Sequence, residues 1–129
     1  MVSAHWESHE LLVSGNPQPE TWHDFGGFPK ALFEVQYPAP GDPRLAAEVA
    51  GLLKSAGLPA RIDSNRPFDH GVWVPLSLMY PQADIPIVQV SLPTRGGPAL
   101  QTQVGHALAS LREQGVLLIG SGSITHNLR

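Results

Sequence analysis

Residues 116–129 have the sequence VLLIGSGSITHNLR, an apolar run followed by Gly-Ser-Gly-Ser and then His126. This pattern predicts a buried strand at 116–119, a glycine-rich turn, and an imidazole held at the carboxyl end of the strand. Ligands of open α/β sheets bind at that edge. Residues 2–6, VSAHW, repeat the arrangement with His5. We therefore expect His5 and His126 to share a metal or catalytic site.

Strands and helices alternate along the rest of the sequence. Asp42 and Pro43 are typical of the N-cap and first residue of a helix, and Gly57 is typical of the residue after its end. The pattern predicts strands at 1–4, 11–13, 60–63, 86–92 and 116–119, helices at 43–56, 74–79 and 98–114, and a long loop at 17–41. Such an order predicts a single α/β domain with a mostly parallel sheet flanked by helices.

The composition excludes several classes of function. The 129 residues carry a net charge of −3 and contain no cysteine, so we expect no disulfide, no thiolate metal site and no nucleic-acid partner. No apolar run approaches the roughly 20 residues that cross a bilayer. No signal peptide is evident, so we expect a cytoplasmic protein without a membrane partner. Because strand-like residues begin at once and the glycine-rich motif stands at the other end, we expect the chain to be part of a longer domain.

The local sequence leaves alternatives open for the candidate residues. His5 is either a metal ligand or a histidine at the edge of a pocket, and His126 is either a site residue or an exposed loop histidine. Asp69 either caps a helix beside a bystander His70, or His70 is a neutral histidine that donates a hydrogen bond to a substrate oxygen. Asn127 is placed to hydrogen-bond a substrate or to orient the ring of His126.

Other polar residues favour structural roles. His23 and Asp24 lie in an aromatic loop, and we expect them to tie this loop together. Ser121 and Ser123 do not fit the G-x-S-x-G nucleophile elbow, which argues against serine hydrolase chemistry. A Gly-Ser-Gly-Ser turn without a following lysine is also a weak match to a phosphate-binding loop.

Five motifs in this order resemble those of a known family. They are Ser3-Ala4-His5-Trp6, His23-Asp24-Phe25-Gly26-Gly27-Phe28-Pro29, Tyr37-Pro38-Ala39-Pro40-Gly41, Asp69-His70-Gly71-x-Trp73-x-Pro75-Leu76 and Gly120-Ser121-Gly122-Ser123-x-x-His126-Asn127-Leu128. Together they resemble the class III extradiol ring-cleavage dioxygenases (LigB-like), most closely the 4,5-DOPA dioxygenase type. The resemblance extends over essentially the whole chain.

The resemblance implies an α/β fold with one metal ion, which is Fe(II) in active enzymes and often Zn(II) in isolated ones. It implies a catechol substrate that is cleaved with O₂. In the family pattern, His5 matches a metal ligand, and His126 matches an acid–base histidine that also contacts the metal. His70 matches a pocket histidine that contacts substrate or oxygen, and Asn127 lies beside the site. We expect the aromatic side chains of Trp6, Trp22 and Phe28 to wall the substrate ring.

The chain departs from the family pattern in its length. Family members are about twice as long and supply further metal ligands before Ser3 and after Leu128. The resemblance therefore leaves two expectations: a dioxygenase-like domain that is inactive or needs a partner chain, or a non-catalytic relative of the Memo-like kind. Exposed sheet edges and apolar surface favour association with another copy, so we expect a homo-oligomer, namely a dimer.

Overall fold

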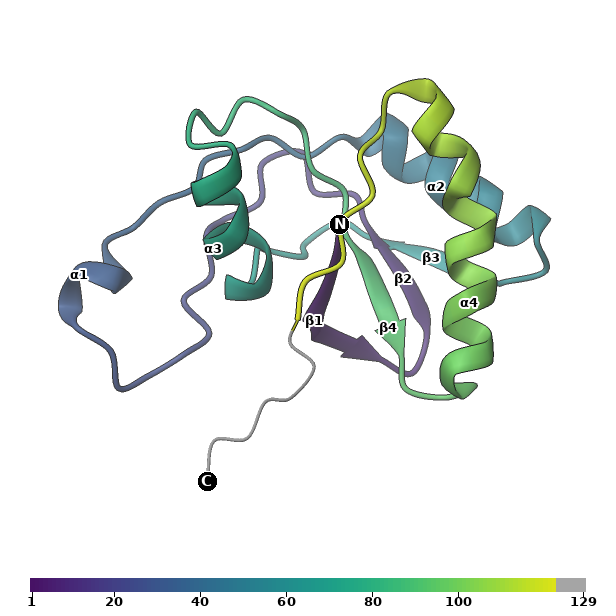
Figure 1. Ribbon diagram of the computed structural model, residues 1–129, viewed down its shortest axis with the longest axis horizontal. Helices are drawn as coiled ribbons and strands as arrows, with labels where there is room; N and C mark the ends of the chain where they lie inside the picture. Colours follow the sequence, from purple (N-terminus) through teal and green to yellow (C-terminus); the bar gives the residue numbers. More distant parts are fainter. Residues whose placement is uncertain (123–129) are drawn as a thin grey trace.

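A four-stranded sheet with the strand order β1-β4-β2-β3 forms the centre of the computed structural model, which describes residues 1–122 (Figure 1). β1 pairs with β4 in parallel, β2 pairs with β3 in parallel, and β2 pairs with β4 in antiparallel orientation. Two of the three pairings are parallel, which confirms the predicted mostly parallel sheet. The strands are β1 (Val2–Ser8), β2 (Leu11–Ser14), β3 (Ala60–Asp63) and β4 (Val90–Pro93).

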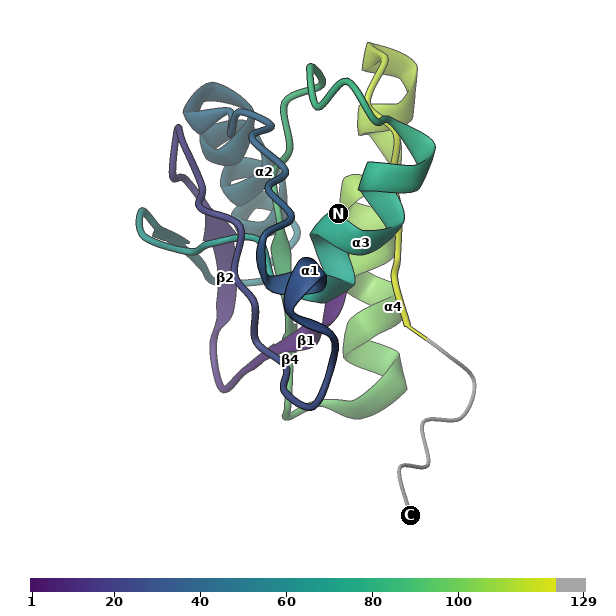
Figure 2. The same cartoon turned by 90° about the vertical axis from the view of Figure 1, so that its left-hand side faces the viewer.

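Helices cover both faces of the sheet (Figures 1 and 2). α2 (Pro43–Ser55) and α4 (Gly97–Leu108) pack on one face, and a 3₁₀ helix, Ala109–Gln114, continues α4. α3 (His70–Met79) packs against β1, next to a loop that carries the short α1 (Lys30–Phe33). The α2/α4 layer has a core that includes Val13, Leu53, Val90, Val104 and Leu108, and the α3 layer has a core that includes Tyr37, Phe68, Val72, Trp73 and Leu76.

The clearest local signals gave the correct elements. The Asp42 carboxylate accepts a hydrogen bond from the Leu45 N–H at 2.9 Å, so Asp42 caps α2 as predicted. Gly57 has a φ of 77°, the left-handed conformation that ends a helix. β2 and β3 lie where the sequence predicted strands at 11–13 and 60–63.

The end of one strand and the starts of two other elements differ from the prediction. β1 continues through His5 and Trp6 to Ser8, so these residues lie within the strand and not after it. α3 begins at His70, because the N–H groups of Val72 and Trp73 already bond to the Asp69 carbonyl. β4 begins at Val90 and not at 86, because the Gln89 N–H bonds to the side-chain hydroxyl of Ser14 in β2 and not to a backbone carbonyl of that strand.

The predicted buried strand at 116–119 is wrong for the described residues. This segment makes one isolated bridge, between Val2 and Gly120, and two flanking backbone bonds to Val2. Leu117 is 58% exposed and Leu118 is 37% exposed. The segment runs beside β1 at the edge of the sheet, where no described helix packs against its outer side, so neither burial nor a full ladder stabilises it. None of the described helices is long and apolar enough to cross a membrane.

Candidate functional site

Two histidines that are distant in the sequence lie together beside β1. His5 comes from the middle of β1, and His70 is the first residue of α3. Their ring centroids are 4.0 Å apart, with 36° between the ring planes. The sequence singled out both residues but did not predict that they meet. His126 and Asn127, which were expected to complete the site, lie outside the described residues.

A buried hydrogen-bond network holds the two histidine-bearing elements together. Asp69 is fully buried, and its carboxylate accepts hydrogen bonds from the Ser3 hydroxyl and from Arg66 Nη2, each at 2.5 Å. The Ser3 hydroxyl in turn accepts the His5 N–H at 3.2 Å. Asp69 occupies the N-cap position of α3, but its side chain makes no capping bond, so the capping alternative describes its position only and its carboxylate serves this network instead.

The absence of a side chain at Gly71 allows α3 to approach β1 closely. A Cβ atom at this position would lie 2.5 Å from Ser3 Oγ, 2.9 Å from His5 Cδ2 and 3.0 Å from Asp69 Oδ1. Real side-chain carbons do not approach other heavy atoms this closely, so a side chain here would push the network apart. Glycine in the Asp69-His70-Gly71 motif is therefore a condition for the His5–His70 contact.

Arg66 lies between two indole rings. Its guanidinium carbon is 4.7 Å from the ring centroid of Trp6 and 5.5 Å from that of Trp22, a cation–π arrangement. Trp6 is buried under this cation, with 5% of its surface exposed. Within residues 1–122, Arg66 Nε is buried without a hydrogen-bond partner. The structure thus gives Trp6 a contact with Arg66, while its predicted contact with a substrate stays a prediction.

Asp24 holds His70 from the loop side. One carboxylate oxygen of Asp24, Oδ1, lies 2.9 Å from the His70 backbone nitrogen and 2.9 Å from His70 Nδ1. The neighbouring His23 lies 2.9 Å, through Nε2, from the Val35 carbonyl. His23 therefore holds the loop together as expected. Asp24 instead bonds to His70 at the start of α3. Sequence spacing could not reveal this contact, because Asp24 and His70 are 46 positions apart.

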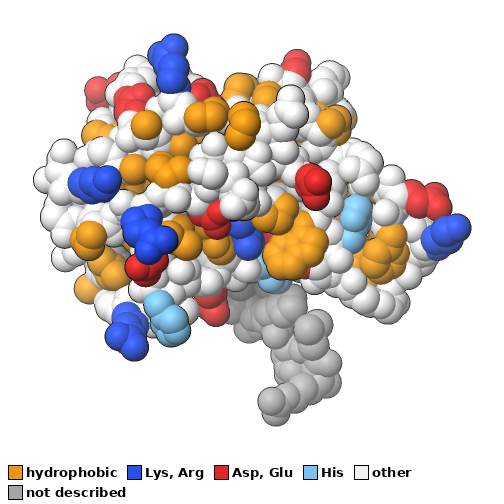
Figure 3. Space-filling view, turned by 180° about the vertical axis from the view of Figure 1, so that it is seen from behind, with side chains coloured by type: hydrophobic (Ala, Val, Ile, Leu, Met, Phe, Trp, Pro, Cys, Tyr) orange, Lys and Arg blue, Asp and Glu red, His pale blue; other side chains and the backbone are white. Residues whose placement is uncertain are grey.

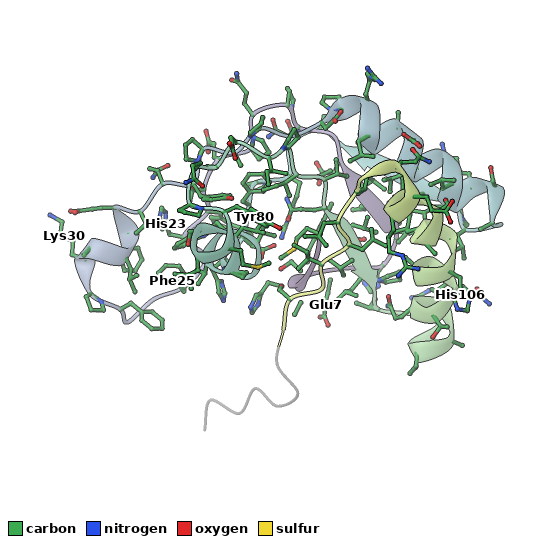
Figure 4. All side chains as sticks on the ribbon, turned by 45° about the horizontal axis from the view of Figure 1, so that its top comes forward. Glu7, His23, Phe25, Lys30, Tyr80 and His106 are labelled. Atoms are coloured by element: carbon green, nitrogen blue, oxygen red, sulfur yellow. The ribbon has the colours of Figure 1, made fainter. Side chains whose placement is uncertain are left out.

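Aromatic rings form a wall beside His70. The Phe25 ring meets the His70 ring edge-on at 5.6 Å, and it also contacts Trp73 at 6.0 Å. Phe28 packs edge-on against Phe25 at 5.4 Å and is 57% exposed, which places it at the outer rim. Figure 4 shows His23 and Phe25 beside α3, with Lys30 farther out on α1. The sequence assigned Phe28 to the wall but not Phe25 or Trp73, although Phe25 stands in the same aromatic loop motif and Trp73 in the motif that begins at Asp69.

The pKa of Asp24 predicts how stability depends on pH. Burial raises this pKa, but hydrogen bonds from His70 outweigh the effect and hold the pKa below its ordinary value of 3.8. A carboxyl group with a lowered folded-state pKa stabilises the fold above its unfolded pKa, and this contribution is lost as pH falls through the folded value. Urea unfolding of the wild type and Asp24→Asn should therefore show a stability difference that shrinks below about pH 4. A difference that stays constant down to about pH 2 would contradict the expectation.

The described residues offer part of a metal site. Among residues 1–122, no group of three His, Asp or Glu side chains is arranged to hold a metal ion. The residues present nevertheless fit a metal ion chemically, because imidazole nitrogen suits both Fe(II) and Zn(II). His5 supplies such a nitrogen beside His70. A mononuclear catalytic metal takes three protein ligands, so residues outside this part of the chain would have to contribute.

A separate apolar cavity of about 730 Å³ lies between β1, α3 and α4. Its lining includes Val2, Leu76, Val88, Val104, Leu117 and Leu118, and does not include His5 or His70. The apolar cavity is therefore a feature distinct from the histidine site.

Seen from behind, Lys and Arg side chains are interspersed with Asp and Glu side chains and are not gathered in one basic surface (Figure 3).

Comparison with known proteins gives consistent relatives. The family described as the catalytic LigB subunit of aromatic ring-opening dioxygenase matches residues 1–129. The 4,5-DOPA dioxygenase extradiol of Escherichia coli (strain K12) is 46% identical over 130 residues, which cover 100% of this chain and 47% of that protein. The protein of the same name from Beta vulgaris is 45% identical over 127 residues, covering 98% of this chain and 47% of that protein.

A solved structure agrees with these sequence matches. The crystal structure of an uncharacterized protein from Escherichia coli K12 superposes with a TM-score of 0.78 at 39% identity. The match covers 98% of this chain and 46% of that one. The chain thus spans about half the length of the relatives it matches.

Proposed function

Because this chain belongs to the LigB family of aromatic ring-opening dioxygenases, we propose that it forms part of an extradiol dioxygenase that cleaves a DOPA-like catechol with O₂. The observation that carries the proposal is the His5–His70 pair, which is held by a buried network in a chain aligned end to end with 4,5-DOPA dioxygenases. The general kind of activity follows from the homologues, which are extradiol dioxygenases.

Each proposed site residue has a role that suits its chemistry. His5 and His126 would hold one metal ion, Fe(II) in the active protein or Zn(II) in its place, since imidazole suits both. When bound, this ion would supply Lewis acidity that lowers the pKa of the catechol hydroxyls and a coordination position for O₂. His126 would take a hydroxyl proton and return it as the ring opens. His70 and Asn127 would contact the substrate.

The aromatic residues would shape the pocket. Phe28 and Phe25 lie on the loop side of His70, where flat rings can pack against a catechol and exclude water. Trp6, which stacks with Arg66, would contact the substrate ring as the sequence predicts. Exclusion of water strengthens electrostatic interactions at the histidines and limits side reactions of a reactive ring.

We propose that residues 1–129 act as one unit of a larger catalytic domain. The described residues contain no three-ligand cluster, and the matched relatives are about twice as long. The remaining ligands would then come from the rest of a LigB-type domain, in the same protein or in a partner chain. No described feature favours a non-catalytic role of the Memo-like kind.

Metal binding tests the proposed function. Fe(II), without oxygen, and Zn(II) would each be titrated into the metal-free protein, with His5→Ala as the site variant and the exposed His106→Ala as its control. Figure 4 shows His106 on α4. We expect His5→Ala to weaken binding by about 100-fold, because a lost ligand costs at least as much as a lost neighbour of a ligand. His106→Ala should change nothing.

A catechol assay completes this test. Fe(II)-loaded protein would be mixed with L-DOPA in air and followed for a yellow ring-opened product. A full-length relative, assayed separately, is the positive control. Binding of the metal that is stoichiometric and dependent on His5, together with product, supports the proposal. If His5→Ala and His106→Ala bind metal equally, the assigned site is wrong.

We further propose that the chain forms a homodimer through its apolar edge. The cavity beside α4 and the exposed side chains of Leu117 and Leu118 present apolar surface next to an incompletely paired sheet edge. The mass of one chain is 13.9 kDa, and light scattering should give twice this mass. A monomer across the micromolar range would contradict this assembly.

The cytoplasmic location expected from the sequence stays a prediction.

A further inference from the structure

We propose that Asp24 is a positioning residue that fixes the ring orientation and tautomer of His70, so that Nδ1 carries the proton and Nε2 is left as a hydrogen-bond acceptor. The consequence for chemistry rests on the proposed function, because it concerns how His70 meets a substrate hydroxyl. The geometry itself is independent of any metal or substrate. No motif within the sequence pointed to this role for Asp24.

Two contacts to one oxygen atom define the arrangement. Asp24 Oδ1 lies 2.9 Å from the backbone nitrogen of His70 and 2.9 Å from its Nδ1. The backbone N–H of a first helical residue has no partner within its own helix, so this bond anchors the carboxylate to α3. The second bond then fixes the rotation of the ring relative to the same backbone. Only 11% of the Asp24 side chain and 29% of the His70 side chain are exposed.

The tautomer follows from the identity of the partner. An ionised carboxylate accepts hydrogen bonds and cannot donate them, so the ring nitrogen that faces it must carry a hydrogen. A neutral imidazole has one N–H, which places it on Nδ1 of His70 and leaves a lone pair on Nε2. The same arrangement orients ligand and catalytic histidines in many proteins. Under this proposal, neutral His70 would accept a hydrogen bond from a catechol hydroxyl, whereas the sequence alternative had it donate one to a substrate oxygen.

Neighbouring contacts keep the Asp24 segment in place. The Trp22 N–H bonds to the Phe68 carbonyl at 2.8 Å, and Trp73 Nε1–H bonds to the Trp22 carbonyl at 2.9 Å. On the other side of Asp24, Phe25 packs edge-on against the His70 ring. The loop is therefore attached to α3 on both sides of Asp24, and replacing this one carboxylate should leave the loop in position.

The tautomer can be read directly by NMR. Long-range ¹H–¹⁵N correlation spectra of the whole metal-free chain, labelled at histidine, distinguish a protonated ring nitrogen from an unprotonated one. In the wild type above the titration range of histidine, we expect His70 to show Nδ1–H and unprotonated Nε2. A spectrum with Nε2–H, or with a mixture of tautomers, would overturn the proposal without any variant.

Variants then assign the effect to Asp24. Asp24→Ala should release His70 to a mixture of tautomers, while Asp24→Asn, which keeps one acceptor oxygen, should shift it less. Asp63→Ala is the matched control, because its carboxylate accepts the Asn65 N–H in an exposed turn. An unchanged His70 spectrum in Asp24→Ala would contradict the proposal. If Asp24→Ala does not fold, the Asp24→Asn spectrum decides the question.

This readout separates the inference from the proposed function. The NMR result involves neither metal nor catechol, so His70 can show the fixed tautomer even where His5→Ala leaves metal binding unchanged. That pair of results would keep Asp24 as a positioning residue and reject the dioxygenase site. The opposite pair would keep the metal site and reject the role of Asp24.

Discussion

Asp69→Ala should lower the free energy of unfolding by about 3–5 kcal/mol, because it leaves the buried Arg66 guanidinium without its counter-charge. Asp69 is fully buried, and 11% of the Arg66 side chain is exposed. The Ser3 hydroxyl would also lose its acceptor. Equilibrium urea unfolding of the purified chain, followed by tryptophan fluorescence and circular dichroism, measures the change.

An exposed ion pair in the same protein provides the matched control. Arg61 and Glu10 lie 2.9 Å apart with 71% and 56% of their side chains exposed. Solvent screens such a pair, so Glu10→Ala should cost less than about 1 kcal/mol. Asp69→Asn, which keeps the shape and the acceptor for Ser3, should fall between the two. If Asp69→Ala and Glu10→Ala lose the same stability, the buried network around Asp69 does not hold β1 and α3 together.

Gly71→Ala should destabilise the fold by about 1–3 kcal/mol and move His5 away from His70. The added methyl group would lie 2.5 Å from Ser3 Oγ and 2.9 Å from His5 Cδ2, so α3 or β1 must shift. We expect urea unfolding to show the lost stability. We also expect the NMR signals of the His5 and His70 rings to shift, because each ring alters the magnetic environment of the other.

A second helical glycine separates the close contact from the intrinsic preference of glycine. Gly51 lies in α2, is exposed, and has no atom within 4 Å of the position that a Cβ would take. Alanine is favoured over glycine in a helix by about 1 kcal/mol, so Gly51→Ala should stabilise the fold. Opposite signs for the two substitutions would demonstrate the steric role of Gly71. Stabilisation by Gly71→Ala would refute it.

Local sequence signals were reliable where a few neighbouring residues decide the structure. The Asp42-Pro43 start and the Gly57 end of α2 depend on contacts within one helical turn, and the structure confirms both. The boundaries of β1 and α3 were less accurate, because they also depend on bonds to distant partners. β1 pairs with β4, and the N–H of His70 at the start of α3 bonds to the Asp24 carboxylate, 46 positions away.

The edge segment shows the limit of pattern alone. Residues 116–119 are apolar enough to be a buried strand, but burial needs a partner on each side. In the described part of the chain, Leu117 and Leu118 instead stay partly exposed at the open apolar cavity. The apolar residues predicted that this segment would pair with the sheet. Because no described element packs over it, the segment does not form a buried strand.

The sequence by itself determined the α/β class, the main helices and strands, the LigB-type motifs and the candidate histidines. Each of these follows from the conformational preferences of neighbouring residues or from short motifs that can be identified in the linear sequence. Only the tertiary structure placed His5 against His70, tied Ser3 to Asp69 across 66 positions, and gave Asp24 a contact with His70. Such pairings depend on which buried charges and hydrogen-bond donors find partners when the layers close, and residue spacing along the chain does not encode that geometry.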